Sequence, residues 1–176
     1  MKSKVLSLIL AVCTLCSLLV SPASAVGGDS AVQMVQALGI LDGTDLESPV
    51  TRAEFSKMLV AASSYKDSVS SEGSGYSLFR DVKSSYWAAE YISCAVSEGW
   101  MTGYTDGTFR PDETVKLEEA CAAVLKLLGY DTSALAGSFP SAQLSKAAAL
   151  GLRDGISLKQ GGTMARRDCA ALFSNL

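Results

Sequence analysis

The sequence contains no histidine. Histidine is the side chain most often used as a general base, as a member of nucleophilic triads and as a ligand of catalytic zinc. Its absence excludes those sites, and no pair of carboxylates stands out as a replacement. We therefore expect a protein that is not an enzyme, with no catalytic residue, no metal site and no cofactor.

Long apolar runs are also scarce, and the single one lies at the N-terminus. Two lysines precede an apolar run at residues 5–20, and the small-x-small triplet Ala23-Ser24-Ala25 follows it. This order is typical of a secretory signal, and the run is short for a membrane span. We expect residues 1–25 to be a signal peptide cleaved after Ala25, with no membrane attachment afterwards.

Basic residues are few in the part that would be exported. Residues 26–176 keep 13 of the 15 lysines and arginines and all 18 acidic residues, so the net charge of this part is −5. Surfaces for nucleic acid or anionic lipid are basic as a whole. We expect no nucleic-acid partner, and any polyanion must be bound at local sites.

Three cysteines remain after the signal segment: Cys94, Cys121 and Cys169. An odd number cannot pair completely within one chain, and the spacing is not that of a zinc site. Each cysteine lies among apolar helix residues, where a reduced thiol packs as a small hydrophobe. We expect three buried thiols, with a single disulfide as the alternative.

A pattern of two helices joined by a glycine-rich turn occurs most clearly in residues 79–130. It opens with Phe-x-Asp-Val at 79–82, and apolar side chains then follow at helical spacing. The turn at 103–111 reads GYTDGTFRP, with a tight Asp-Gly pair and a stiffening proline. A second amphipathic helix is predicted from about 115 to 128.

The same plan recurs in shorter form at 26–66 and 131–176, with a Ser/Gly-rich linker at 67–78. One amphipathic pair is too small to bury its apolar stripe alone, so we expect the three units to share one core. The predicted core residues are Phe55, Met58, Leu59, Val124, Leu128, Leu172 and Phe173.

This pattern resembles the S-layer homology family. The resemblance is strong for repeat two (79–130), good for the VTRAE run of repeat one (50–54), and weak for repeat three, which lacks the Phe-x-Asp-Val and Trp opening. It implies an all-α fold, with three helix–loop–helix repeats in a pseudo-threefold arrangement around a central three-helix bundle. It also implies a location at the bacterial cell wall or cell surface.

The resemblance further implies that grooves between the repeats bind an anionic secondary cell-wall polysaccharide, often through a pyruvylated sugar. The leading function is therefore a non-covalent surface anchor. The alternative is a structural surface-layer protein that works mainly through contacts with other surface-layer proteins and keeps vestigial glycan grooves.

The run Thr51-Arg52-Ala53-Glu54 contains the first candidate site residues. Thr51 and Glu54 have the spacing of a capping box, which competes with a role in ligand binding. Arg52 is not needed for the cap and would project from a helix N-terminus, where anions are favoured. Its guanidinium suits the carboxylate of a pyruvylated sugar, a surface salt bridge being the alternative. We expect Arg52→Ala to weaken binding and to leave folding almost unchanged.

The other repeats depart from this run. In repeat two Leu117 replaces the arginine, and Lys116 adds charge without the bidentate geometry. In repeat three Arg166 matches the arginine and Asp168 the acid, while Ala165 lacks the cap hydroxyl. We expect unequal grooves, with Arg166 contributing less than Arg52.

Four further candidates lie in repeat two. Asp81 is predicted either to hold a turn or to accept sugar hydroxyls, and Trp87 either to pack in the core or to give a sugar a flat apolar face. Tyr104 and Arg110 flank the Asp-Gly turn and are carbohydrate-binding candidates. The turn lacks the further acids of a calcium loop, so we expect no calcium there.

Overall fold

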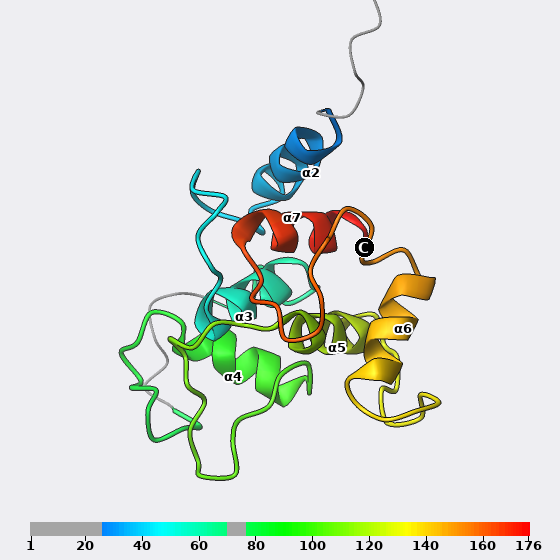
Figure 1. Cartoon of the computed structure of the whole chain (residues 1–176). Coiled ribbons are helices and arrows are strands. Elements are labelled where there is room, and N and C mark those ends of the chain that lie inside the picture. The colour runs from blue at the N-terminus through cyan, green and yellow to red at the C-terminus, as the bar shows by residue number, and fades with distance from the viewer. Residues whose placement is uncertain (1–25, 70–76) are drawn as a thin grey trace, which may run out of the picture.

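The computed structural model describes residues 26–69 and 77–176 (Figure 1). The predicted signal peptide and most of the predicted 67–78 linker lie outside these ranges, so the proposed repeat boundaries stay predictions. The helices are α2 (Val26–Ala37), α3 (Arg52–Ala61), α4 (Ala89–Ser97), α5 (Leu117–Leu127), α6 (Ser141–Ala149) and α7 (Arg166–Ser174). Besides these helices, the described ranges hold only isolated β-bridges. The all-α prediction is confirmed.

The helices pack between neighbouring repeats and not within one repeat. α4 packs on α3, α6 packs on α5, and α2, the first helix, packs on α7, the last (Figure 1). The first and last helices of the described chain therefore lie together. Each predicted helix–loop–helix unit gives one helix to each of two pairs, which explains why no unit could bury its apolar stripe alone.

A closed ring of backbone hydrogen bonds joins the segments that lead into α3, α5 and α7. The Val50 N–H donates to Met164 O at 2.9 Å, the Met164 N–H to Val115 O at 3.1 Å, and the Val115 N–H to Val50 O at 3.0 Å. All three residues are almost fully buried. In this dry environment the bonds satisfy groups that water cannot reach. The ring brings the starts of α3, α5 and α7 together.

The shared core contains six of the seven residues predicted for it, namely Phe55, Met58, Leu59, Val124, Leu172 and Phe173. Phe55 of α3 and Phe173 of α7 meet with ring centroids 5.6 Å apart. The prediction for Leu128 is wrong, because its side chain is 42% exposed. Leu128 is the C-cap residue of α5, and Gly129 ends the helix there with a φ of +84°.

Helix α4 begins later than its apolar pattern suggests, at Ala89. Trp87 therefore lies in the turn before the helix, where its side chain is 41% exposed. Among the described residues, no helix combines the length and the hydropathy that crossing a bilayer requires.

The three cysteines of the described ranges form no disulfide. Cys121 and Cys169 are fully buried and Cys94 is half-buried, so the prediction holds for two thiols and only partly for Cys94. Burial raises the pKa of Cys121 to about 11 and raises that of Cys169 further. The pKa of Cys94 is also raised, chiefly by burial.

These environments predict the order in which the thiols react. Because thiolate is the nucleophile, Cys121 and Cys169 should not react with a thiol reagent at pH 8 until denaturant is added, and Cys94 should react slowly before then. Mass spectrometry of the labelled protein measures this order. Rapid labelling of Cys121 or Cys169 in the native protein would contradict the packing of α5 and α7.

Candidate functional site

The starts of α3, α5 and α7 share one arrangement. The third residue of each helix is acidic and accepts the N–H of the residue that precedes the helix: Glu54 from Thr51, Glu119 from Lys116 and Asp168 from Ala165, each at 2.9 Å. Only Thr51 adds the reciprocal bond, in which its hydroxyl oxygen accepts the Glu54 N–H at 3.2 Å. The predicted capping box is confirmed for Thr51 and Glu54.

The side chain of Arg52 is placed differently from our expectation. It does not project into solvent, since the residue is only 5% exposed. Its Nε donates to Phe109 O at 2.9 Å and its Nη2 to Thr102 O at 2.8 Å. The guanidinium also lies 4.5 Å from the ring centroid of Phe109 and 5.1 Å from that of Tyr104. Arg52 therefore ties α3 to the turn of repeat two, so the expectation that its side chain projects from the helix start is wrong.

One edge of Arg52 nevertheless faces a groove, which we call the α5–α6 groove. Its Nη1 lies 3.9 Å from Glu119 Oε1, beyond hydrogen-bonding distance. The groove has a volume of about 240 Å³. Its lining is Arg52, Trp100, Met101, Thr102, Glu119, Ala122, Ala123, Lys126, Thr132, Phe139 and Gln143.

Three further candidates lie in the turn of repeat two or against it. Both carboxylate oxygens of Asp81 accept backbone N–H groups, from Phe109 at 2.8 Å and from Arg110 at 2.7 Å. Arg110 has a φ of +58°, and its guanidinium lies 3.8 Å from the ring centroid of Tyr104. Asp81, Tyr104 and Arg110 thus build the turn that receives Arg52, and a role for them in sugar binding stays a prediction.

Arg166 lies in a second groove, which we call the α3–α7 groove. Its Nη2 donates to Glu54 Oε1 at 2.5 Å and its Nη1 donates to Asp42 O. Its side chain is 21% exposed, against 6% for that of Arg52. The groove has a volume of about 190 Å³, and its lining is Ile40, Leu41, Asp42, Val50, Glu54, Lys57, Met58, Trp87 and Arg166.

The α3–α7 groove brings together three of the predicted site residues, Glu54, Trp87 and Arg166. Trp87 stacks with Tyr86, with ring centroids 5.8 Å apart, and stays half exposed at the groove edge. Trp87 is therefore not packed in the core, and its side chain is accessible at the surface. Sequence reasoning missed Lys57, whose ammonium pairs with Asp42 in the same groove.

The interface between α5 and α7 differs from the other two. Leu117, the first residue of α5, is fully buried, so this interface has no counterpart of Arg52 or Arg166. The nearby turn carries Arg153, whose Nη2 donates to Leu158 O at 3.2 Å. Arg153 lies close enough to Cys121 to oppose slightly the pKa increase that burial causes there. The expectation of unequal interfaces fits these contacts.

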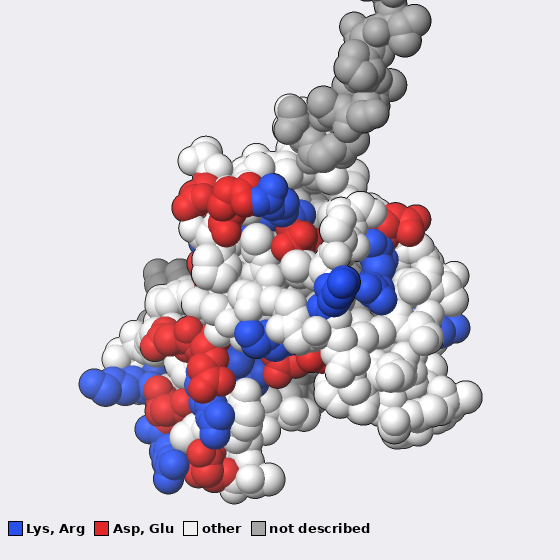
Figure 2. Space-filling model, in the orientation of Figure 1, with Lys and Arg blue, Asp and Glu red and all other residues white. Residues whose placement is uncertain are grey.

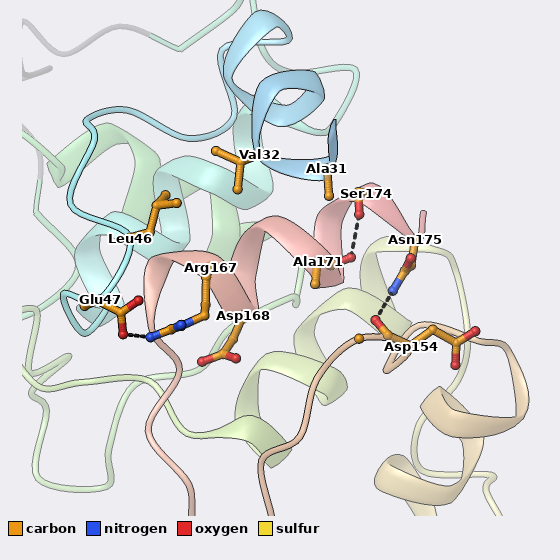
Figure 3. A pocket seen from close by; sticks show the side chains of 11 residues that line it. Ala31, Val32, Leu46, Glu47, Asp154, Arg167, Asp168, Ala171, Ser174 and Asn175 are labelled. Atoms are coloured by element: carbon orange, nitrogen blue, oxygen red, sulfur yellow. Dashed lines mark hydrogen bonds and ion pairs between the residues drawn. The ribbon is translucent and has the colours of Figure 1, made fainter. Parts of the chain in front are cut away.

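A cavity with a volume of about 530 Å³ lies between α2 and α7 (Figure 3). Its lining is Ala31, Val32, Leu46, Glu47, Asp154, Gly155, Arg167, Asp168, Ala171, Ser174 and Asn175. We call it the α2–α7 cavity. Asp168, a predicted site residue, thus lies away from both arginine grooves.

The three linings differ in net charge. The α3–α7 groove contains two acidic and two basic side chains, the α5–α6 groove one acidic and two basic, and the α2–α7 cavity three acidic and one basic. On the face shown in Figure 2, acidic and basic side chains lie side by side over the loops beside α4. Local pairing and not a general field therefore governs how an anion can bind.

Residues 26–69 and 77–176 contain no group of three or more acidic or cysteine side chains placed to hold a metal ion. Asp106, in the Asp-Gly turn, is used within the turn. The Thr108 hydroxyl donates to its Oδ1 at 2.6 Å, and this bond lowers the pKa of Asp106.

Comparison with known proteins points to cell-surface proteins. The chain is 32% identical over 149 residues to the "Cell surface protein" of Thermoanaerobacter kivui, an alignment covering 82% of this chain and 19% of that protein. It is 28% identical over 134 residues to the "Middle cell wall protein" of Brevibacillus brevis, covering 73% of this chain and 12% of that one. It is also 35% identical over 86 residues to the "Cellulosome-anchoring protein" of Acetivibrio thermocellus, covering 47% and 18%.

These similarities define the class as bacterial cell-surface proteins. The chain spans about a fifth or less of the length of each of these relatives. Residues 78–121 match the S-layer homology domain, which is the repeat that the sequence marks most clearly. This part of the chain belongs to the S-layer homology family.

The contacts of Arg52 predict a structural penalty for its removal. Arg52→Ala leaves the carbonyls of Thr102 and Phe109 without their donor and opens a cavity, so it should lower the free energy of unfolding by roughly 2–4 kcal/mol. Arg80→Ala is the matched control, because the Arg80 side chain is 68% exposed and should matter by less than about 0.5 kcal/mol. Urea unfolding measures both, and equal stability of the two variants would contradict the structural role.

Proposed function

We propose that this chain is a non-covalent cell-wall anchor that binds an anionic, pyruvylated secondary cell-wall polysaccharide in the grooves between its repeats. The match of residues 78–121 to the S-layer homology domain supports the anchoring role, as does the name of the cellulosome-anchoring relative.

The observation that carries the proposal is the grouping of Arg166, Lys57 and Trp87 in the α3–α7 groove. A guanidinium and an ammonium attract a carboxylate, and the guanidinium can bind it in a bidentate manner. The exposed indole of Trp87 offers a flat apolar face to a sugar ring. The groove volume of about 190 Å³ suits one sugar unit more than a long stretch of polymer.

The accessible arginine makes the α3–α7 groove the main site in this proposal. The two bonds from Arg52 to backbone carbonyls commit that side chain to the fold, whereas Arg166 is more exposed. Glu54 and Asp42 already pair with Arg166 and Lys57, so a ligand carboxylate must compete with them. The ranking expected from the sequence, with Arg52 ahead of Arg166, is therefore reversed in the proposal.

The α5–α6 groove is proposed as a second, weaker site. It offers two basic groups. Nη1 of Arg52 lies 3.9 Å from Glu119 Oε1, and the ammonium of Lys126 has no ionic partner among the described residues. Phe139, 58% exposed at the groove, is the counterpart of Trp87 as an aromatic surface. Its lining has one more basic than acidic side chain, which favours an anion.

The second candidate function is surface assembly through protein contacts. It is favoured by the interface between α5 and α7, where Leu117 replaces the arginine and where the neighbouring cavity is acidic. A pull-down with purified wall sacculi, before and after removal of the polysaccharide, separates the two functions. Binding that is lost with the polysaccharide supports the anchor, and binding that persists supports the alternative.

Adjacent arginines at the start of α7 give a matched pair of variants. Arg166→Ala should weaken binding to sacculi by roughly 2 kcal/mol, or about 30-fold, because it removes a charge partner from a partly dry groove. Arg167→Ala should have little effect, since Arg167 pairs with Glu47 outside that groove. Co-sedimentation over a range of protein concentrations measures both affinities.

Two further variants of the groove test the same site. Arg166→Lys should recover only part of the loss, because an ammonium lacks the fork of the guanidinium. Trp87→Ala should weaken binding with little change in thermal stability, as the side chain is half exposed. If Arg167→Ala weakens binding and Arg166→Ala does not, the α3–α7 groove is not the site.

A further inference from the structure

The acidic residue at the third position of α3, α5 and α7 differs in its ionic contacts from one interface to the next. Glu54 of α3 pairs with Arg166 at 2.5 Å, and Glu119 of α5 lies 3.9 Å from Arg52. The equivalent acid of α7 is Asp168, and the residue that would supply its arginine is Leu117. Oδ2 of Asp168 accepts the Ala165 N–H, and no described arginine or lysine pairs with the Asp168 carboxylate.

Asp168 lines the α2–α7 cavity, which differs in size and polarity from the two grooves. Its volume of about 530 Å³ lies in the range of ligand pockets, and neither groove reaches that range. Figure 3 shows α2 above α7, and the cavity is lined by the apolar side chains of Ala31, Val32 and Ala171 from these two helices. Leu46 extends this apolar surface at the side.

The charge of the cavity selects the class of ligand. Arg167, the single basic side chain of the lining, forms an ion pair with Glu47. Asp154 and Asp168 are then the two carboxylates without a cation in the lining, which repels an acidic polymer and attracts a cation. The apolar surface beside them suits aliphatic side chains.

We propose that the α2–α7 cavity docks an arginine-bearing segment of another surface protein, whose guanidinium pairs with Asp168 in place of the internal arginine that Leu117 has replaced. The guanidinium repeats the contact that Arg166 makes with Glu54 within the chain. Aliphatic residues flanking the arginine lie on Val32, Leu46 and Ala171. The chain thus has an anion-binding face and, on α7, a separate site for a cationic protein partner.

The test compares two short peptides that differ in charge alone. The probes are fluorescently labelled Leu-Arg-Leu and Leu-citrulline-Leu, each with blocked ends, and fluorescence polarisation measures their binding to the purified protein. The arginine peptide should bind at least tenfold more tightly than the citrulline peptide. Asp168→Asn should remove this difference, while its amide oxygen can still accept the Ala165 N–H. Equal binding of the two peptides overturns the proposal.

A matched pair of cavity variants tests the location independently of charge. Ala171→Phe fills the cavity beside Asp168 and should abolish binding of the arginine peptide. Ala122→Phe is the control, because Ala122 occupies the equivalent position of α5 and lines the α5–α6 groove. Loss of binding in Ala122→Phe with retention in Ala171→Phe places the peptide elsewhere and refutes the proposal.

A third test introduces an arginine within the chain that can pair with Asp168. The double variant Leu117→Arg with Arg153→Met reproduces the combination of Arg52 with Met101 in the α5–α6 groove, because Leu117 occupies the position of Arg52 and Arg153 that of Met101. The new arginine should pair with Asp168 and weaken binding of the peptide at least tenfold. If this double variant does not fold, Asp168→Asn and Ala171→Phe decide alone. Binding of a glucosamine tetramer that depends on Asp168, without binding of the arginine peptide, would assign the cavity to a glycan and refute the protein partner.

Discussion

The closed ring of hydrogen bonds among Val50, Val115 and Met164 is the constraint on which the rest of the structure depends. Each residue donates one backbone bond and accepts one, so the loss of any member leaves buried groups of two neighbours unsatisfied. The ring joins segments far apart in the sequence, and the packing of α2 on α7 closes the chain around it. Because the ring fixes where α3, α5 and α7 begin, it also fixes where their first and third side chains meet.

The three interfaces differ because of what surrounds each helix start. The long turn of repeat two folds over α3, and its Thr102 and Phe109 carbonyls and aromatic rings enclose the guanidinium of Arg52. Gly103 permits this turn, since a Cβ there would lie 2.1 Å from the ring of Phe79. The turn of repeat one is shorter and provides a single carbonyl, from Asp42, so Arg166 stays partly accessible. The same residue type is thus buried against the turn at one interface and stays partly accessible at another.

Local signals in the sequence were sufficient for the all-α class, for the capping box of Thr51 and Glu54, and for most of the core, because each depends on spacing within one helix. Leu128 fits the apolar stripe of its helix, but the stripe does not reveal that α5 ends one residue earlier. The burial of Arg52 could not be predicted in this way, since its acceptors lie 50 and 57 residues further along the chain. Lys57 was missed for the same reason, because its groove forms only when α7 packs beside α3.

The start of α7 shows how one helix can serve two surfaces of opposite preference. Successive residues of an α-helix point about 100° apart, so Arg166 and Arg167 face different neighbours although they are adjacent in sequence. Arg166 enters the α3–α7 groove, where acidic and basic side chains balance, and Arg167 borders the acidic α2–α7 cavity. The two proposals therefore assign a negative polymer and a positive protein segment to the same helix end without a shared residue. Because both sites rely on charge at a partly exposed surface, salt should weaken the two together while the buried ring keeps their geometry unchanged.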